Sequence, residues 1–264
     1  MKNLKFTLII NAVLAFFVIG NSHANTLSAT YFQISSSDPS YNTLCCGTYN
    51  NEVLNTLGPD GLPLLNPAYP GTMPNSADLH NTLSGKEITW WSPSLNNNVT
   101  QTGTGTVTLP INHPFNYYPP NGTGTSDANG GLTAVFSGTL AVPTTEQISF
   151  SIGADDSAFA YLDGNIVCDL GGVHGYTPGT CVSPFNISAG THNLELFFVD
   201  MNQTQSGLYF DIATTGVTST GGTTGVPEPA TLALLGIGII GLGFSRRTNN
   251  KGLDINQLCY INHE

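Results

Sequence analysis

Asp155 and Asp156 are adjacent carboxylates between two strand-like segments, and no other residues of this chain suggest chemistry so directly. Neighbouring carboxylates repel each other unless a cation or strong hydrogen-bond donors compensate their charge. Ca²⁺ binds about six to eight oxygen atoms, so the pair would supply only part of its shell. Asp200, Asn202 or Gln203, together with backbone carbonyls, are the candidates for the rest. We therefore predict a Ca²⁺ site here; the alternative is an acidic turn that caps neighbouring N–H groups.

A glycine-rich turn, Leu170-Gly171-Gly172-Val173, lies between Asp169 and His174. Because glycine has no Cβ, this backbone can approach another surface closely. Asp169 and His174 are candidates to line a ligand-binding groove, although they could equally satisfy the amides of the turn. The chain contains neither G-x-S-x-G nor H-E-x-x-H, and adjacent carboxylates do not have the separation of a glycosidase pair. We therefore expect a binding protein rather than an enzyme.

Trp90 and Trp91 are adjacent aromatic residues in a region rich in proline, asparagine and glycine. A flat aromatic ring matches the apolar face of a sugar ring and buries a large area. These two side chains are candidates to bind a ligand by stacking on a sugar, and the alternative is that they pack in the core or beneath loops.

Four cysteines lie in the part of the chain that we expect to be exported into an oxidising compartment. A disulfide between Cys168 and Cys181 would close a loop of about 15 residues, which is worth ~3 kcal/mol in the chain-entropy model. We predict this pair. Cys45 and Cys46 are either bonded to each other or paired elsewhere, because sequence alone does not determine connectivity.

The elements that must position these residues are predicted to be strands. The 264 residues include 30 glycines and 16 prolines, and only 9% are charged, which favours many short strands joined by turns. Alternating patterns place a strand on each side of the acidic pair, and Asp163-Gly164 is typical of a two-residue hairpin turn. The predicted strands are 27–34, 86–91, 105–111, 132–142, 147–152, 158–162, 165–168, 192–200 and 206–213.

Both ends of the chain carry export signals. Lys2 and Lys5 precede an apolar run over 6–19 and a small-x-small site ending at Ala24, as in a secretory signal peptide. An apolar stretch over 230–244 is followed by Arg246 and Arg247, which predicts a transmembrane helix with the arginines on the cytoplasmic side. The predicted organisation is a signal peptide (1–24), a β domain (25–213), a Gly/Thr-rich linker (214–226), a sorting segment with the membrane span (227–247) and a short tail (248–264).

Charge narrows the choice of partners. Between the predicted cleavage site and the sorting segment the only lysine or arginine is Lys86, against more than a dozen carboxylates. Such a surface repels nucleic acid, so we expect no nucleic-acid partner.

Pro227-Glu228-Pro229, the apolar stretch and Arg246-Arg247 together resemble the PEP-CTERM sorting signal of Gram-negative bacteria. The resemblance implies recognition and cleavage by an exosortase in the inner membrane, followed by transfer to the cell surface or the extracellular polysaccharide matrix. The tail over 248–264, which includes Cys259, is longer than this family usually has.

The β domain resembles the PA14-like group, especially its fibro-slime branch. The resemblance rests on FSGTL at 136–140, ISFSI at 148–152, the acidic pair with FAYLDG at 159–164, VCDLGGVHG at 167–175, ELFF at 195–198 and SGLYF at 206–210. It implies a β-sandwich or barrel that binds carbohydrate, with Ca²⁺ held by consecutive aspartates joined by a cis peptide. Cysteine at 168 departs from the family pattern and fits the predicted disulfide.

These observations together predict an exported, non-enzymatic protein of the cell surface or matrix, with a carbohydrate-binding, Ca²⁺-assisted β domain. The alternative is a structural matrix protein that makes protein–protein contacts and in which any Ca²⁺ is purely stabilising.

Overall fold

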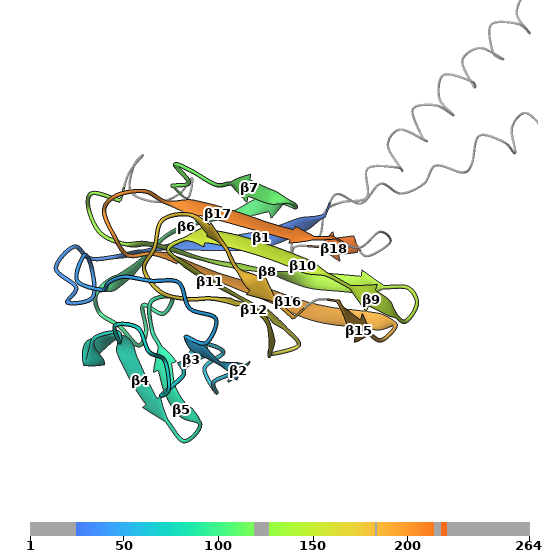
Figure 1. The fold of residues 1–264 in the computed structure, drawn as a ribbon, viewed down its shortest axis with the longest axis horizontal. Helices are drawn as coiled ribbons and strands as arrows, with labels where there is room; N and C mark the ends of the chain where they lie inside the picture. Colours follow the sequence, from blue (N-terminus) through green and yellow to red (C-terminus); the bar gives the residue numbers. More distant parts are fainter. Residues whose placement is uncertain (1–24, 119–126, 183, 214–217, 221–264) are drawn as a thin grey trace, which may run out of the picture. The chain divides into compact units, whose positions relative to one another are not determined.

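The computed structural model describes residues 25–118, 127–182, 184–213 and 218–220 (Figure 1). These residues form strands, with a single short 3₁₀ helix, η1 (Ser76–Asp78), among them. The prediction of an all-β protein is therefore confirmed. The expected signal peptide, sorting segment and tail lie outside the described residues, and no helix within those residues has the length and apolar character of a membrane span.

The larger sheet carries most of the described strands and has 12 of them. Its central path runs in the order β4 (Leu79–Thr82), β5 (Gly85–Ile88), β3 (Pro63–Leu65), β2 (Val53–Leu57), β12 (Asn165–Leu170), β11 (Ser157–Leu162), β16 (Gly190–Asp200), β8 (Leu132–Val142), β1 (Thr26–Ile34) and β6 (Val99–Thr108). Two short strands pair at its side: β14 (Thr180–Cys181) with β12, and β18 (Thr218–Thr220) with β8. Because β18 falls within the predicted linker, sheet pairing continues beyond the predicted domain end at residue 213.

A smaller sheet covers one face of the larger one (Figure 1). Its strands are β13 (Thr177–Pro178), β10 (Phe150–Asp155), β17 (Gly207–Ile212) and β7 (Ile111–His113), and a separate pair is formed by β15 (Phe185–Ile187) and β9 (Glu146–Ile148). Buried side chains of both sheets form one hydrophobic cluster, in which Phe136 and Leu196 meet Phe150 and Phe210. The alternation of β10 and β17 explains this layer, since every second side chain points to the same face.

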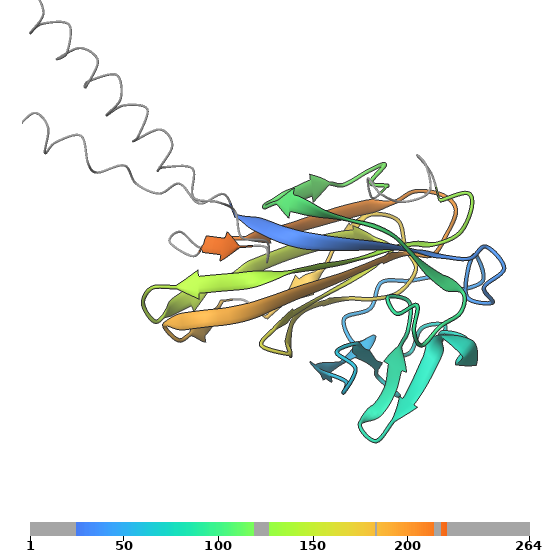
Figure 2. The same ribbon diagram turned by 180° about the vertical axis from the view of Figure 1, so that it is seen from behind.

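The opposite face of the larger sheet has its own core. Successive residues of a strand point to opposite faces, so Phe159 and Phe197 leave the first cluster and join a second one beneath the segment that contains β2 to β5. This segment is visible from both sides of the molecule in Figure 1 and Figure 2. Strands β11 and β16 are thus covered on both faces, and every residue of β11 is buried.

The predicted ligand-binding role of Trp90 and Trp91 is wrong. Their exposed fractions are only 1% and 4%, and both belong to the second core cluster. The ring of Trp91 packs edge to face against Phe159 and Phe197, and its Nε1–H donates a hydrogen bond of 2.8 Å to the Phe198 carbonyl. Neither ring presents a face to a sugar, so the core-packing alternative is the correct one.

Candidate functional site

The acidic pair lies where the chain passes from the smaller sheet to the larger one. Asp155 ends β10 and pairs with Gly207, whereas Ser157 begins β11 and pairs with Val199. The peptide bond between Asp155 and Asp156 is cis, as the family resemblance implied. Both side chains are buried, and burial raises the pKa of Asp155 to about 6 and that of Asp156 to about 7.

Backbone amides hold the Asp156 carboxylate in place. Its Oδ1 accepts from the N–H of His174 at 3.0 Å, and its Oδ2 accepts from the N–H groups of Met201 at 2.8 Å and Asn202 at 3.2 Å. Asn202 therefore lies at the predicted site, but it contributes its backbone N–H to the carboxylate. In part this is the predicted alternative, a carboxylate that caps neighbouring amides. The same contacts fix the direction in which the remaining oxygen lone pairs point.

Asp200 lies at the end of β16 and is the least satisfied group of the site. Its exposed fraction is 0%, and no described residue donates a hydrogen bond to either carboxylate oxygen. Ser206 is close, but its single hydroxyl hydrogen is donated to the Tyr117 carbonyl at 2.5 Å. Burial raises the pKa of Asp200 well above its ordinary value, and the charges of Asp156, Asp127 and Asp155 raise it further.

Asp127 is a fourth buried carboxylate of this cluster, and the sequence reasoning missed it. Its Oδ2 has no hydrogen-bond partner among the described residues, and its charge raises the pKa of Asp155 and Asp200. We call Asp127, Asp155, Asp156 and Asp200 the acidic cluster. The acidic cluster is an oxygen-rich site that no lysine or arginine neutralises. Lys86 is the only lysine or arginine between residues 25 and 226, and it lies on β5, which carries no residue of the cluster.

Orphaned, buried carboxylate oxygens fit the hard oxygen donors that Ca²⁺ prefers. However, no three residues of the acidic cluster have carboxylate oxygens that all lie within 4.8 Å of one another. Within the described parts of the chain, the only three His, Cys or carboxylate groups that do so are Asp60, His80 and Glu87, which belong to a different region.

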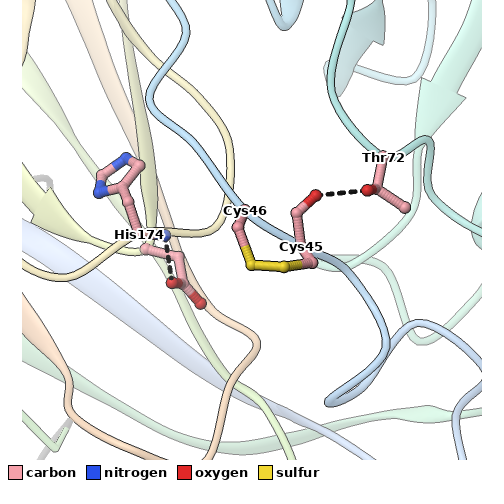
Figure 3. Close-up of a disulfide and its surroundings, with 5 residues drawn as sticks. Cys45, Cys46, Thr72 and His174 are labelled. Atoms are coloured by element: carbon pink, nitrogen blue, oxygen red, sulfur yellow. Dashed lines mark hydrogen bonds between the residues drawn. A yellow bond between two sulfur atoms is a disulfide. The ribbon is translucent and has the colours of Figure 1, made fainter.

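The glycine-rich turn packs against the segment 45–52 (Figure 3). Tyr49 and Gly171 exchange two backbone hydrogen bonds of 2.8 Å, and the N–H of Gly47 donates to the Val173 carbonyl at 2.9 Å. Gly172 has a φ of +96°, and a Cβ at this position would lie 2.0 Å from the Gly47 carbonyl oxygen. The predicted close approach of this turn to another surface is therefore present, and that surface belongs to the same chain.

Cys45 and Cys46 are bonded to each other in the structure, which favours the first of the two alternatives left open by the sequence. Figure 3 shows this disulfide beside the His174 loop, with the Thr72 hydroxyl donating to the Cys45 carbonyl. Cys168 and Cys181 form the predicted second disulfide, and they are direct cross-strand partners on β12 and β14.

Glu52 connects the segment 45–52 to the glycine-rich turn, and no pattern in the sequence indicates this role. Its Oε2 accepts from the N–H of Gly172 at 2.6 Å and lies 3.3 Å from Ser157 Oγ. Burial raises the pKa of Glu52 to about 7. The next residue, Val53, donates its N–H to Asp169 Oδ2 at 3.3 Å. Glu52 and its neighbour Val53 thus contact both the glycine-rich turn and Asp169.

Asp169 borders an open cleft of about 530 Å³, but its carboxylate is buried: Oδ2 accepts from the N–H of Val53, and Oδ1 has no hydrogen-bond partner among the described residues. Its role in a ligand-binding groove stays a prediction. Four asparagines contribute polar groups to the cleft, and the lining as a whole is Asn50, Asn51, Val53, Leu54, Asn55, Asn66, Ile166, Val167, Asp169, Thr180, Cys181 and Val182. Burial raises the pKa of Asp169 to about 7. His174 is not part of this lining: its N–H binds Asp156, and its Nδ1 lies 3.0 Å from the Gly175 carbonyl. The structure therefore separates the two predicted groove residues.

Comparisons with known proteins identify the C-terminal motif. The family described as the PEP-CTERM protein-sorting motif matches residues 225–247, which confirms the prediction for Pro227, Glu228, Pro229, Arg246 and Arg247. A comparison with curated protein sequences gives no match.

Solved structures that resemble this chain include PA14 domains. The PA14 domain of the MpAFP antifreeze protein has 13% identity and a TM-score of 0.41, and the match covers 78% of this chain and 96% of that one. The PA14 sugar-binding domain from an RTX adhesin has 11% identity and a TM-score of 0.33, with 75% and 99% covered. The epithelial adhesin 9 A domain from Candida glabrata, in complex with Galβ1-4GlcNAc, has 14% identity and a TM-score of 0.33, with 77% and 94% covered.

At these scores the likenesses assign no ligand to this chain. What the comparisons do identify is its export class: the chain carries a PEP-CTERM protein-sorting motif behind an all-β domain.

Proposed function

We propose that this chain is an exported protein of the cell surface or extracellular matrix whose PA14-like β-sandwich binds carbohydrate with the assistance of Ca²⁺. The sorting motif over 225–247 supports export and a transient stay in the inner membrane through the apolar stretch 230–244. An exosortase-type enzyme would then cut near Pro227-Glu228-Pro229 and release the β domain toward the matrix.

The observation that carries the Ca²⁺ part is Asp200, a fully buried carboxylate whose two oxygens have no described hydrogen-bond partner. A buried, unpaired carboxylate is costly unless it is protonated or neutralised by a cation. Ca²⁺ would be held by Asp200 with Asp155, Asp156 and Asp127, whose oxygens would have to draw closer together to share one ion, and backbone carbonyls would complete the shell. The cation would supply the positive charge that no lysine or arginine supplies here.

The cleft beside Asp169 is the proposed carbohydrate site. Asparagine amides are suitable hydrogen-bond partners for sugar hydroxyls, and the apolar part of the lining can face a sugar ring. The buried Asp169 carboxylate would position the edge of the cleft through its hydrogen bond to Val53. Asp169 is the only carboxylate in the lining of this cleft, whereas glycoside hydrolysis ordinarily uses two. We therefore infer binding without catalysis.

A chain of contacts joins the two sites. The Asp156 carboxylate accepts a hydrogen bond from the N–H of His174, at the end of the glycine-rich turn. The Glu52 carboxylate accepts one from Gly172 in the same turn. Val53, the residue after Glu52, donates its N–H to Asp169. Ca²⁺ at the acidic cluster would order this turn and thereby the cleft. Binding of carbohydrate is then expected to depend on Ca²⁺ although the ion does not touch the sugar.

The test uses the full chain on a glycan array in about 2 mM Ca²⁺, which exceeds the dissociation constants of ~10⁻⁴ to 10⁻³ M of weak extracellular Ca²⁺ sites. The same array is run in excess chelator, and thermal melting is measured under the same two conditions. For the wild type we expect a higher melting temperature in Ca²⁺ than in chelator, and retention on at least one glycan in Ca²⁺ only. Asp169→Asn should lose this retention but keep the rise in melting temperature on addition of Ca²⁺. An unchanged melting temperature would remove Ca²⁺ from the proposal. Retention that Asp169→Asn does not weaken would remove the cleft.

A structural matrix protein is the second candidate, and the burial of the acidic cluster favours it. A Ca²⁺ ion enclosed by buried carboxylates can stabilise the domain without taking part in recognition. In this case the melting temperature still rises with Ca²⁺, the array stays clean, and the chain associates with itself in a salt-dependent way, which light scattering would detect.

A further inference from the structure

Asp60, His80 and Glu87 form a second group of potential metal ligands, far from the acidic cluster in sequence. Asp60 lies in the turn between β2 and β3, His80 on β4 and Glu87 on β5. His80 and Glu87 are direct cross-strand partners in the β4–β5 hairpin, so their side chains leave the sheet on the same face. The hairpin is the segment at the end of the larger sheet in Figure 1.

The spacing of the three groups suits a small divalent cation. One potential ligand atom from each residue lies within 4.8 Å of the other two, and His80 Nε2 is 3.5 Å from Asp60 Oδ2. A tetrahedral Zn²⁺ with bonds of about 2.0–2.2 Å holds neighbouring ligand atoms roughly 3.3–3.5 Å apart. The Asp60–His80 distance already has this value, and a modest movement of Glu87 would complete the set.

Glu87 provides an independent indication. Its exposed fraction is 0%; Oε1 accepts from the N–H of Asp60 at 2.9 Å, but Oε2 has no hydrogen-bond partner among the described residues. Lys86 does not compensate this charge, because adjacent strand residues point to opposite faces of the sheet. A surface ion pair between Asp60 and His80 would explain those two residues but would leave the buried Glu87 oxygen unpaired.

We propose that Asp60, His80 and Glu87 bind a divalent transition metal ion, with Zn²⁺ the best-matched ion. The imidazole nitrogen favours Zn²⁺ and its neighbours in the transition series over Ca²⁺ and Mg²⁺, which prefer shells made of oxygen alone. The side chains of His80 and Asp60 are 42% and 46% exposed, so the ion has access from solvent and a fourth position stays open to water or another ligand. The bound ion fastens the β2–β3 turn to the β4–β5 hairpin. This proposal is independent of the Ca²⁺ and carbohydrate proposals.

The test is a calorimetric titration of the full, chelator-treated chain with Zn²⁺ alone, followed by thermal melting. His80→Gln and Asp60→Asn are the test variants, because both side chains are partly exposed and their replacement removes little packing. His192→Gln is the matched control: His192 also pairs with an aspartate, Asp163, at 2.7 Å, but it belongs to no such group of three within the described residues.

We expect saturable binding of one Zn²⁺ that His80→Gln and Asp60→Asn each weaken at least about tenfold, with a Zn²⁺-dependent rise in melting temperature that both variants lose. His192→Gln should bind as the wild type does. Co²⁺ should give the visible absorption of a site with nitrogen and oxygen ligands, and His80→Gln should alter that spectrum. Zn²⁺ binding that survives His80→Gln, that His192→Gln removes, or that excess Ca²⁺ displaces would overturn the proposal, as would the absence of saturable binding.

Discussion

Asp156 and Asp200 belong to the same acidic cluster, but their carboxylates differ in the number of hydrogen bonds that they accept. Asp156 accepts three backbone hydrogen bonds, whereas Asp200 accepts none from a described residue, although both are buried. Hydrogen bonds to a carboxylate favour its charged form, and burial opposes it. Asp156 is therefore a group that organises its surroundings, and Asp200 is the group that most requires a cation.

This difference predicts unequal effects of two isosteric substitutions on the stability of the chelator-treated protein. Asp156→Asn keeps only one side-chain acceptor oxygen and sets an NH₂ against backbone donors, so it should destabilise the chelator-treated protein by about 1–3 kcal/mol. Asp200→Asn loses no hydrogen bond and should leave the melting temperature in chelator within about 2 °C of the wild type, which corresponds to about 1 kcal/mol or less for a domain of this size.

Both variants should lose the rise in melting temperature on addition of Ca²⁺, whereas Glu146→Gln, a control on β9, should keep it. Thermal melting with and without Ca²⁺ measures all three. A wild-type Ca²⁺ shift in Asp200→Asn would show that this carboxylate is not a ligand.

At the scale of elements, the site depends on two connections of different origin. One is the passage from β10 to β11, which carries the acidic pair between the sheets. The other is the packing of the segment 45–52 on the glycine-rich turn, where Gly172 combines a left-handed φ with a close backbone neighbour. An L-residue with a side chain is disfavoured there on both counts.

Gly172→Ala is therefore expected to separate the segment 45–52 from the glycine-rich turn. The added Cβ would lie 2.0 Å from the Gly47 carbonyl oxygen, so the backbone must move. We expect a loss of roughly 2–4 kcal/mol of stability and a large loss of glycan retention. Gly175→Ala is the matched control, because no atom lies within 4 Å of a Cβ at that position and its φ is not positive. Chemical denaturation compares them, and equal stabilities of the two variants would contradict the role of the turn.

The elements around the acidic pair could be predicted because their signals are local. Alternation located β8 at 132–142, and Asp163 and Gly164 adopt the positive φ values, +50° and +74°, of the predicted tight turn. The Cys168–Cys181 disulfide was predictable because its partners are close in sequence. Glu52 was not, because its partner Gly172 is 120 residues away and no local pattern marks a buried glutamate.

At the scale of the whole molecule, the second hydrophobic core is what the sequence could not show. Periodicity indicates that a strand has an apolar face, but it does not indicate that the segment with β2 to β5 covers the outer face of the larger sheet. Trp90 and Trp91 therefore looked available to a ligand and are in fact buried. The same covering layer encloses Glu52 and Asp169, which explains how an acidic protein comes to bury several carboxylates.

These buried carboxylates make the stability of the whole domain depend on pH in a direction opposite to that of most acidic groups. Burial raises the pKa of Asp156, Glu52 and Asp169 to about 7, whereas carboxylates of an unfolded chain titrate near 4. Between these values the folded state binds more protons than the unfolded state, so the free energy of unfolding falls as pH rises. This contribution is fully present below about pH 4 and is lost as pH rises through about 7.

In excess chelator we therefore expect the melting temperature at pH 8 to lie at least about 3 °C below that at pH 5, which corresponds to roughly 1 kcal/mol for a domain of this size. Ca²⁺ binds the deprotonated carboxylates of the acidic cluster, which includes Asp156 but not Glu52 or Asp169, so its addition should recover part of the loss at pH 8 and little at pH 5. Repulsion among the negative charges of a chain with a net charge of −11 also lowers the melting temperature as pH rises. The variant Glu52→Gln separates this general repulsion from the effect of the buried carboxylates. This variant should flatten the pH dependence although it changes the net charge by only one. A higher melting temperature at pH 8 than at pH 5 in chelator would mean that these carboxylates are stabilised in their charged form by the protein itself, and the case for a cation would fall with it.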